Sequence, residues 1–369
     1  MNRYATQANA WTEWHQGIPA FAGPMLETLY GSLYSSLPQL RLGALDGVNT
    51  YLACANERPQ ALFLYRPGGH SAHVVNEGMQ ITAADASRFA IQLFARHPEI
   101  NRITFHAVAL DGEPDWPSSV RFTLDEDIVL DLPASEDGYL TSLGKSTRKS
   151  LRQRLARAQG LTHCIVPGPE IDAALVDELI GFNHARLTAK QRFSALDRTA
   201  ARQLLALVRA CGMAGVVRIE GRLCGGTLAC RFGDDVYSLV NAHDPAFDHL
   251  GMGNLSRHLM IVAAIHAGAR RFHLLGGNFS SKRGCGARRQ PLQHLLLYRS
   301  RRRMLADSTH LAALALRAWR YRIGVALDEG TINPPSAGKP WRLPALLRRL
   351  LTGARSMKRH LRGNAATAR

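Results

Sequence analysis

Several features are scarce or missing in this sequence of 369 residues, and each absence excludes a class of protein. The six cysteines form no CxxC pair and show no metal-ligand spacing to histidine, which excludes a zinc-finger or disulfide framework and indicates reduced thiols. No uncharged apolar run reaches the roughly 18 residues of a membrane-spanning helix. The N-terminal residues also lack the apolar centre of a signal peptide. We therefore expect a cytoplasmic protein without a metal cofactor.

Acidic residues are scarce in one part of the chain only. The net charge of +17 comes from 46 Lys and Arg against 29 Asp and Glu. Residues 299–369 contain 16 of these basic residues and 3 of the acidic ones, so residues 1–298 are nearly balanced. Binding to an anionic membrane or nucleic acid is expected first from this C-terminal segment.

Apolar and polar residues alternate in an order that repeats along the chain. The first part predicts strands and one helix, at 40–45, 50–55, 61–67, 71–75, 83–96 (the helix) and 102–108. A later part predicts a helix at 201–212, strands at 215–221, 224–232 and 236–242, a helix from about 253 to 267, and a strand at 271–276. This order indicates two related α/β halves, although chance could also produce it.

Basic residues gather in "GKSTRKSLRQRLARAQG" (144–160) between the two halves. Ser146 or Thr147 can cap a helix there, and Gly160 can end it. Arg148 and Arg152 are four residues apart, so they share one helix face. Two interpretations stay open, a solvated helix face or a face that binds an anionic substrate.

A strand at 236–242 leads through a polar loop to Gly251-x-Gly253, where a helix is expected to begin. The free N–H groups and the positive dipole end of such a helix can bind a phosphate, but glycines also occur there for steric reasons alone. A dinucleotide-binding fingerprint is excluded because the third glycine is missing. "GGNFSSKR" (276–283) is not a Walker loop, because Ser281 and Arg283 replace its second glycine and its hydroxyl residue.

Three stretches, 146–160, 216–255 and 268–286, together resemble the GNAT-type acyltransferases. Within these, the chain is most similar to the bacterial group related to Fem-type peptidoglycan transferases, cell-envelope and exopolysaccharide acyltransferases, and antimicrobial-peptide-resistance proteins. The resemblance implies an α/β (α+β) fold of tandem GNAT-like lobes, each a mixed, mostly antiparallel sheet flanked by helices. It places these lobes at residues 1–140 and 141–298, followed by a basic helical tail at 299–369.

The resemblance also implies that the second lobe holds an acyl-CoA, such as acetyl-CoA, as co-substrate. The pantetheine arm would lie along the strand that contains Leu239, Val240 and Asn241. The pyrophosphate would lie at the start of the following helix, at Gly251, Gly253 and Asn254. Many members have Gln or Arg at the position of Asp248. A carboxylate at that position would repel a pyrophosphate, unless the loop is built differently.

Direct acyl transfer needs a base for the acceptor and a group that stabilises the oxyanion. His273 is a candidate base because imidazole titrates near neutral pH, with a packed strand histidine as the alternative. Lys282 is the candidate for stabilising negative charge, with a solvated loop cation as the alternative. Cys285 is not expected to act as a nucleophile. The candidates for binding the acceptor are Arg148, Arg152, His184 and Arg186.

The tail at 339–363 places leucines at helical spacing among arginines and lysines. Such a helix can lie on an anionic membrane surface, or its leucines can pack on the protein core. The helix expected at 311–327 contains three arginines, so it can touch a membrane but not span it. A peripheral position on the inner membrane would fit this reading.

The sequence therefore predicts an acyl-CoA-dependent N- or O-acyltransferase acting on a sugar, peptide or other cell-envelope precursor, either a small molecule or lipid-linked. One alternative is a Fem-type aminoacyl-tRNA-dependent transferase, whose RNA would bind the basic helix and tail. Another is a non-catalytic protein that binds an anion or a membrane. DNA is not an expected partner.

Overall fold

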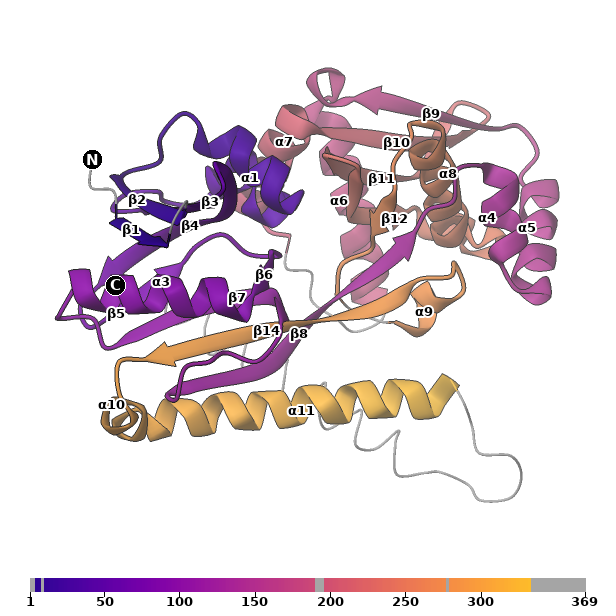
Figure 1. Ribbon diagram of the computed structural model, residues 1–369. Helices are drawn as coiled ribbons and strands as arrows, with labels where there is room; N and C mark the ends of the chain where they lie inside the picture. Colours follow the sequence, from indigo (N-terminus) through magenta and orange to yellow (C-terminus); the bar gives the residue numbers. More distant parts are fainter. Residues whose placement is uncertain (1–3, 8–9, 190–195, 277–278, 333–369) are drawn as a thin grey trace, which may run out of the picture.

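One mixed sheet runs through the whole molecule in the computed structural model, which describes residues 4–7, 10–189, 196–276 and 279–332 (Figure 1). Its 14 strands follow the order β1-β2-β3-β4-β5-β7-β14-β8-β13-β12-β11-β10-β9, and β6 pairs with β7. The pairs β5–β7, β6–β7 and β12–β13 are parallel, and the other neighbouring strands are antiparallel. The sheet therefore connects two lobes through its centre.

The first lobe consists of a strand meander and the helices that cover it. Its strands are β1 (Tyr4–Gln7), β2 (Ala10–Gln16), β3 (Asn49–Ala55), β4 (Arg58–Gly68), β5 (Ser71–Val74), β6 (Gln80–Thr82), β7 (Arg102–Asp111) and β8 (Ser119–Asp131). Its helices are α1 (Ala22–Tyr30), the 3₁₀ turn η1 (Leu33–Ser35), α2 (Leu37–Leu40) and α3 (Ala83–Arg96).

The second lobe repeats the alternation of helices and strands. Its strands are β9 (Leu161–Pro167), β10 (Gly212–Ile219), β11 (Arg222–Phe232), β12 (Asp235–His243), β13 (Arg271–His273) and β14 (Arg288–Tyr298). Its helices are α4 (Glu136–Ser142), α5 (Lys145–Arg157), η2 (Gly168–Glu170), α6 (Ala173–Ala189), α7 (Arg198–Cys211), η3 (Pro245–Leu250), α8 (Met252–His266) and α9 (Ser280–Arg283). The helices α10 (Arg301–Ala306) and α11 (Ser308–Ile332) follow.

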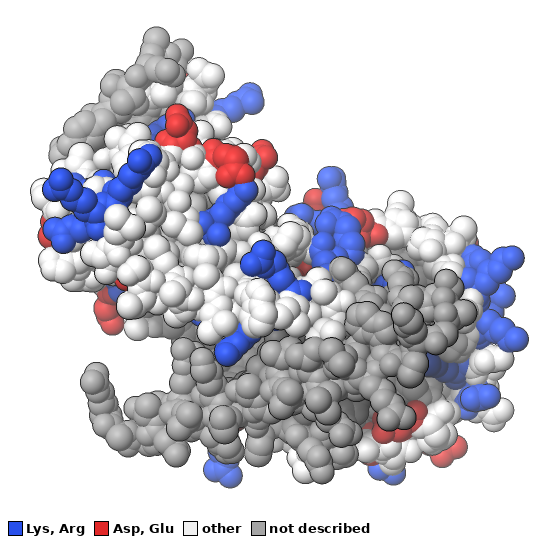
Figure 2. All heavy atoms as spheres, turned by 90° about the horizontal axis from the view of Figure 1, so that it is seen from below, with Lys and Arg blue, Asp and Glu red and all other residues white. Residues whose placement is uncertain are grey.

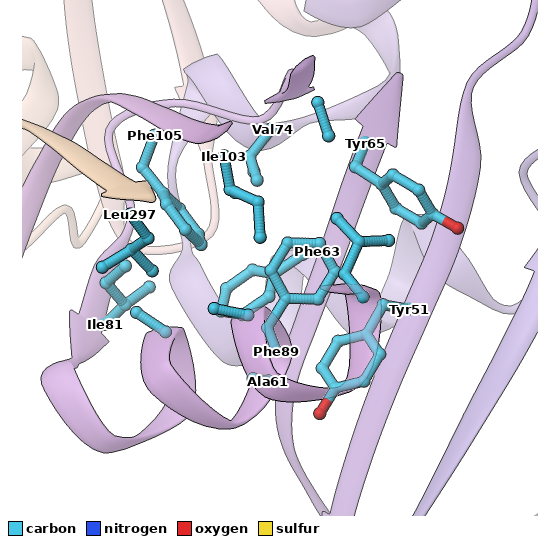
Figure 3. Packing of buried hydrophobic residues seen from close by; sticks show 14 of the residues in the cluster. Tyr51, Ala61, Phe63, Tyr65, Val74, Ile81, Phe89, Ile103, Phe105 and Leu297 are labelled. Carbon is cyan, nitrogen blue, oxygen red and sulfur yellow. The ribbon is translucent and has the colours of Figure 1, made fainter. Parts of the chain in front are cut away.

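Helix α3 closes the core of the first lobe. The Thr82 side chain caps its first turn, and apolar residues three and four apart form one buried face. On this face the Phe89 ring lies 4.9 Å from Tyr51 and 5.3 Å from Phe63, measured between ring centroids. Figure 3 shows these rings packed together, with Leu297 of β14 on the same core. This core therefore joins helix α3 to β14, a strand that lies about 200 residues later in the chain.

The two lobes share strands across their boundary. Strand β14 pairs with both β7 and β8, and β8 in turn pairs with β13 of the second lobe. Figure 1 shows β8 and β14 as a long central pair, with α11 lying along them. The tandem-lobe fold is therefore confirmed, and β14, from within residues 141–298, completes the sheet of the first lobe. A division of the chain near residue 140 stays a prediction.

Helices cover both faces of the second lobe's sheet. The buried residues of α8 pack with Val217, Cys224 and Ala229, whereas those of α6 and α7 pack with Val216 and Leu228. Neighbouring strand residues thus contact opposite helix layers, as expected for a strand whose side chains alternate between faces. This arrangement leaves the end of β12 and the start of α8 together at one edge of the core.

The structure corrects two predicted strands. Residues 40–45 form the end of α2 and the turns after it, because Ser36 caps a helix with a proline in its first turn and Gly43 follows. The last strand, predicted at 271–276, ends at His273 because Leu275 has φ +58°. All six cysteines are free thiols. Among the described helices, none combines the length and apolar character needed to cross a membrane. The predicted amphipathic tail, 339–363, lies outside the described residues.

Candidate functional site

Strands β12 and β13 run side by side for three residues and then separate. Their last pair is Tyr237 with His273, after which β12 continues to His243. The register between β11 and β12 skips Leu239, which forms a β-bulge. Within the described residues, β12 therefore presents a backbone edge beyond Tyr237 that β13 does not cover.

The open edge of β12 leads to the N-terminus of α8. Gly251 has φ +65° and no side chain caps the helix there. The Asn241 Nδ2 donates to the carbonyl oxygen of Gly253 at 2.9 Å, which ties the strand end to the first helical turn. The residues predicted to hold the donor are thus brought together at this corner, namely Leu239, Val240, Asn241, Gly251, Gly253 and Asn254.

Two side chains approach the backbone of this corner closely. A Cβ added at Gly251 would lie 2.8 Å from the guanidinium carbon of Arg154, and one added at Gly253 would lie 2.9 Å from the His243 ring. The carboxylate of Asp248 lies 2.6 Å from Nε2 of His243. Asp248 is therefore held by the His243 ring, and the guanidinium group of Arg154 on α5 places a positive charge beside Gly251.

A cavity of about 760 Å³ lies where the two lobes meet. Both the first lobe and the paired starts of β12 and β13 contribute to it, including Tyr34, Glu77, Asp127, Asp235 and His273. Tyr237 and Leu275, which border the point where the strands separate, also line it. The cavity therefore reaches the open strand edge.

His273 is held between two carboxylates in this cavity. Its Nδ1 lies 2.5 Å from Asp127 Oδ2, and its Nε2 lies 3.2 Å from Asp235 Oδ2 without the alignment of a hydrogen bond. Burial lowers the pKa of His273, but the two carboxylates outweigh it and raise the pKa above 6.5. The Tyr237 ring stacks on the imidazole with 4.2 Å between centroids. The site therefore favours a protonated ring.

Asp235 is also bound by a guanidinium group. Arg271 Nε and Nη2 donate to its two oxygens at 2.9 and 2.6 Å, a bidentate contact. Burial raises the pKa of Asp235, but His273 and Arg271 outweigh burial and lower it below 3.8. The carboxylate is thus ionised at neutral pH.

Lys282 lies next to the cavity, and its ammonium group faces backbone oxygens. Its Nζ donates to the carbonyl oxygens of Leu274, Leu275 and Gly276 at 2.6, 2.8 and 3.1 Å. Burial, together with the neighbouring Arg257, lowers its pKa from 10.5 to about 8. These contacts use the three N–H donors of the ammonium form, so they fix the chain that follows β13.

Three polar side chains in contact, Asp125, His294 and His106, extend from the cavity into the first lobe. Asp125, which lines the cavity, has Oδ2 2.9 Å from His294 Nε2, and His294 Nδ1 lies 3.1 Å from His106 Nδ1. Burial and the nearby His294 lower the pKa of His106 to about 4. His106 is therefore uncharged at neutral pH and contacts His294 as a neutral ring.

The residues predicted to bind the acceptor do not line this cavity. They lie on two helices, with Arg148 and Arg152 on α5 and His184 and Arg186 on α6. Figure 2 shows Lys and Arg gathered at the end of the molecule that carries α5. Cys285 is a half-buried thiol whose pKa is raised by burial.

Sequence reasoning missed the acidic residues of the cavity. Three of them are consecutive in "DEDIVLD" (125–131), inside a strand-like apolar run of a basic chain. Acidic residues are disfavoured in strands, so their presence there was the available signal. Asp235 lies beside a turn, where acidic residues are common, so the sequence carries no comparable signal for it.

Comparisons with known proteins agree with the geometry of the second lobe. Residues 145–283 match the family described as acetyltransferase (GNAT) domain. FemX, a solved structure, is 11% identical with a TM-score of 0.56, over 77% of this chain and 96% of its own. Because identity is low, this likeness shows a shared fold only.

Two further solved structures have lower TM-scores. L-PGS from Bacillus licheniformis is 15% identical with a TM-score of 0.48, over 82% of this chain and 97% of its own. A tandem GNAT protein from the clavulanic acid biosynthesis pathway is 12% identical with a TM-score of 0.41, over 77% and 98%. No curated protein gives a sequence match.

Proposed function

We propose that this protein, an acyltransferase whose residues 145–283 form a GNAT acetyltransferase domain, takes its acyl group from acyl-CoA. The acceptor would be an amine or hydroxyl of a sugar, peptide or other cell-envelope precursor. Its nitrogen or oxygen attacks the thioester carbon, the C–S bond breaks, and the sulfur leaves as the CoA thiol. The proton that the acceptor nitrogen or oxygen loses ends on the departing sulfur, and the acyl group passes directly to the acceptor without a covalent enzyme intermediate.

The separation of β12 from β13 is the observation that supports an acyl-CoA donor most strongly. An extended pantetheine arm carries amide groups, which can pair with the backbone edge that β12 offers beyond Tyr237. Two buried atoms at this edge, Asn241 Oδ1 and His243 Nδ1, have no hydrogen-bond partner among the described residues. An orphaned buried polar atom costs free energy unless a ligand or water meets it, so the edge suits a polar chain.

The start of α8 suits the donor's pyrophosphate. Backbone N–H groups of a first helical turn have no partner within the helix, and the helix dipole favours an anion there. Arg154 stands beside Gly251 and adds a full positive charge. We expect its guanidinium group to bind a phosphate oxygen of the donor.

The contacts of His273 and Lys282 support positioning roles. A protonated His273 holds Asp127 and Asp235 in place rather than taking a proton. Lys282 binds backbone carbonyls of the chain that follows β13, and fixing this chain would keep the donor groove open. A direct catalytic role for either residue stays a prediction.

Calorimetric titration with acetyl-CoA, longer acyl-CoAs and desulfo-CoA tests the donor. The wild-type protein should bind at least one of them. Arg154→Ala should weaken binding about 10-fold or more, because a charge-assisted hydrogen bond contributes about 1.5–3 kcal/mol. Arg157→Ala, an exposed arginine in the last turn of the same helix, is the matched control and should stay within about 2-fold. Absence of binding to every CoA compound would reject this donor.

A Fem-type transfer from aminoacyl-tRNA is the second candidate. It is favoured by the cationic surface of α5, whose arginines can bind RNA phosphates. In that case a charged tRNA should bind, with an affinity that falls steeply as salt rises, and Arg148→Ala plus Arg152→Ala should reduce the salt dependence. Tight binding of tRNA without binding of CoA would favour this candidate over acyl-CoA.

A further inference from the structure

The cavity between the lobes carries an excess of negative charge. Arg271 and His273 are its basic residues, whereas its carboxylates belong to Glu27, Glu77, Asp125, Glu126, Asp127, Asp234 and Asp235. Several of these have basic partners outside the cavity, such as Arg270 for Asp234 and His294 for Asp125. The lining itself nevertheless remains acidic in a protein whose net charge is +17. An anionic acceptor would be repelled from this space.

Two buried polar atoms at the cavity lack hydrogen-bond partners within the described residues. They are Asp127 Oδ1 and His273 Nε2, and the His273 side chain is only 7% exposed. Asp127 uses its other oxygen for His273, so Oδ1 is available to a donor. Because an unsatisfied buried acceptor is costly, this atom indicates a ligand group that donates hydrogen bonds.

Aromatic rings complete the lining. Tyr34 and Tyr237 both face the cavity and meet edge to face with 6.1 Å between centroids. Tyrosine rings attract alkylammonium ions through their faces, and their apolar edges accept a methylene chain. The cavity has a volume of about 760 Å³, and its carboxylates are spread over the lining. It therefore suits a chain with separated positive charges better than a single small cation.

We infer that the acceptor is an alkylamine with at least two ammonium groups, bound in this cavity between Asp127 and Glu77. This inference rests on the proposed function and names its acceptor class. One ammonium group stays paired with the carboxylates. The other loses its proton at the point where β12 and β13 separate, and its nitrogen attacks the acyl carbon. A C–N bond forms, the C–S bond breaks, and the products are an amide, the CoA thiol and one proton.

Calorimetric binding of spermidine without any acyl donor tests the site separately from the proposed function. Wild-type protein should bind spermidine, bind 4-amino-1-butanol at least 10-fold more weakly, and show no binding of 1,4-butanediol. Asp127→Asn and Glu77→Gln should each weaken spermidine binding 10-fold or more. Asp131→Asn, on the same strand and exposed beside Arg288, should stay within 2-fold.

The comparison of spermidine with the singly charged aminobutanol and the uncharged butanediol needs no variant, so a substitution that harms folding does not remove the test. Equal binding of spermidine and butanediol, or none of either, would overturn the inference. Spermidine binding without acylation by acetyl-CoA or by the longer acyl-CoAs would leave the binding site in place and reject the proposed donor.

Discussion

Asp235→Asn removes a buried negative charge, and Asp234→Asn at the neighbouring position is its matched control. The Asp235 side chain is 4% exposed and pairs with Arg271 at 2.6 Å. Asp234 pairs with Arg270 at 3.1 Å, with the two side chains 59% and 81% exposed. These two Asp–Arg pairs therefore share their chemistry and differ in burial.

Burial decides the expected size of the two effects. Removing one partner of a buried ion pair costs about 3–5 kcal/mol, but the Arg271 side chain is 42% exposed and keeps part of its hydration. We therefore expect Asp235→Asn to cost about 2–4 kcal/mol, against about 0–1 kcal/mol for Asp234→Asn. At an unfolding entropy of about 2.1 cal/mol/K per residue, the thermal midpoint of this chain of 369 residues should fall by about 2.5–5 °C for Asp235→Asn and by less than about 1.5 °C for Asp234→Asn.

The difference in the free energy of unfolding between wild type and Asp235→Asn should also depend on pH. The folded-state pKa of Asp235 is below 3.8, so its stabilisation is present above pH 3.8 and lost as the pH falls through that folded value. The folded-state pKa of His273 is above 6.5, so its stabilisation is present below pH 6.5 and lost as the pH rises through its folded value. The difference should therefore be largest between about pH 4 and 6.5.

Thermal unfolding of the three proteins, measured from pH 3 to 8, checks both expectations. Equal losses in the two variants would refute the role assigned to burial. A loss for Asp235→Asn that does not vary with pH would refute the electrostatic account of the His273 cluster.

Two further predictions concern the first lobe. Phe89→Ala should lower the free energy of unfolding by about 3–5 kcal/mol because it empties the centre of the aromatic core, as measured by denaturant titration; a loss near that of a surface substitution would contradict this packing. His106 should titrate near pH 4 by NMR, and His106→Gln should weaken the loss of stability as the pH falls from 6.5 towards 4, because the wild-type ring is held neutral when folded. A midpoint at or above pH 6 would show that the ring is not desolvated as the structure indicates.

Elements with a local signature could be predicted from the sequence. Helix α3 was predicted at 83–96 and is found there, since its cap, its apolar spacing and its end all lie within the same segment. Strands β8 and β14 were missed, although they form the centre of the sheet. Strand β8 contains consecutive acidic residues that face the cavity, and β14 ends in a continuous buried run, so neither shows a clean alternation.

The same division applies to the candidate site. The proposed donor site consists of the end of β12, Gly251-x-Gly253 and the start of α8, which are contiguous in the chain. It could be predicted from the sequence because backbone geometry and the helix dipole are local properties. The acidic cavity has no contiguous pattern, because its lining runs from Glu27 to Leu292. Its carboxylates become one site only when β8 pairs with β13 and the first lobe packs against β12. Electrostatic character of that kind depends on distances between chain segments, and these exist only after folding.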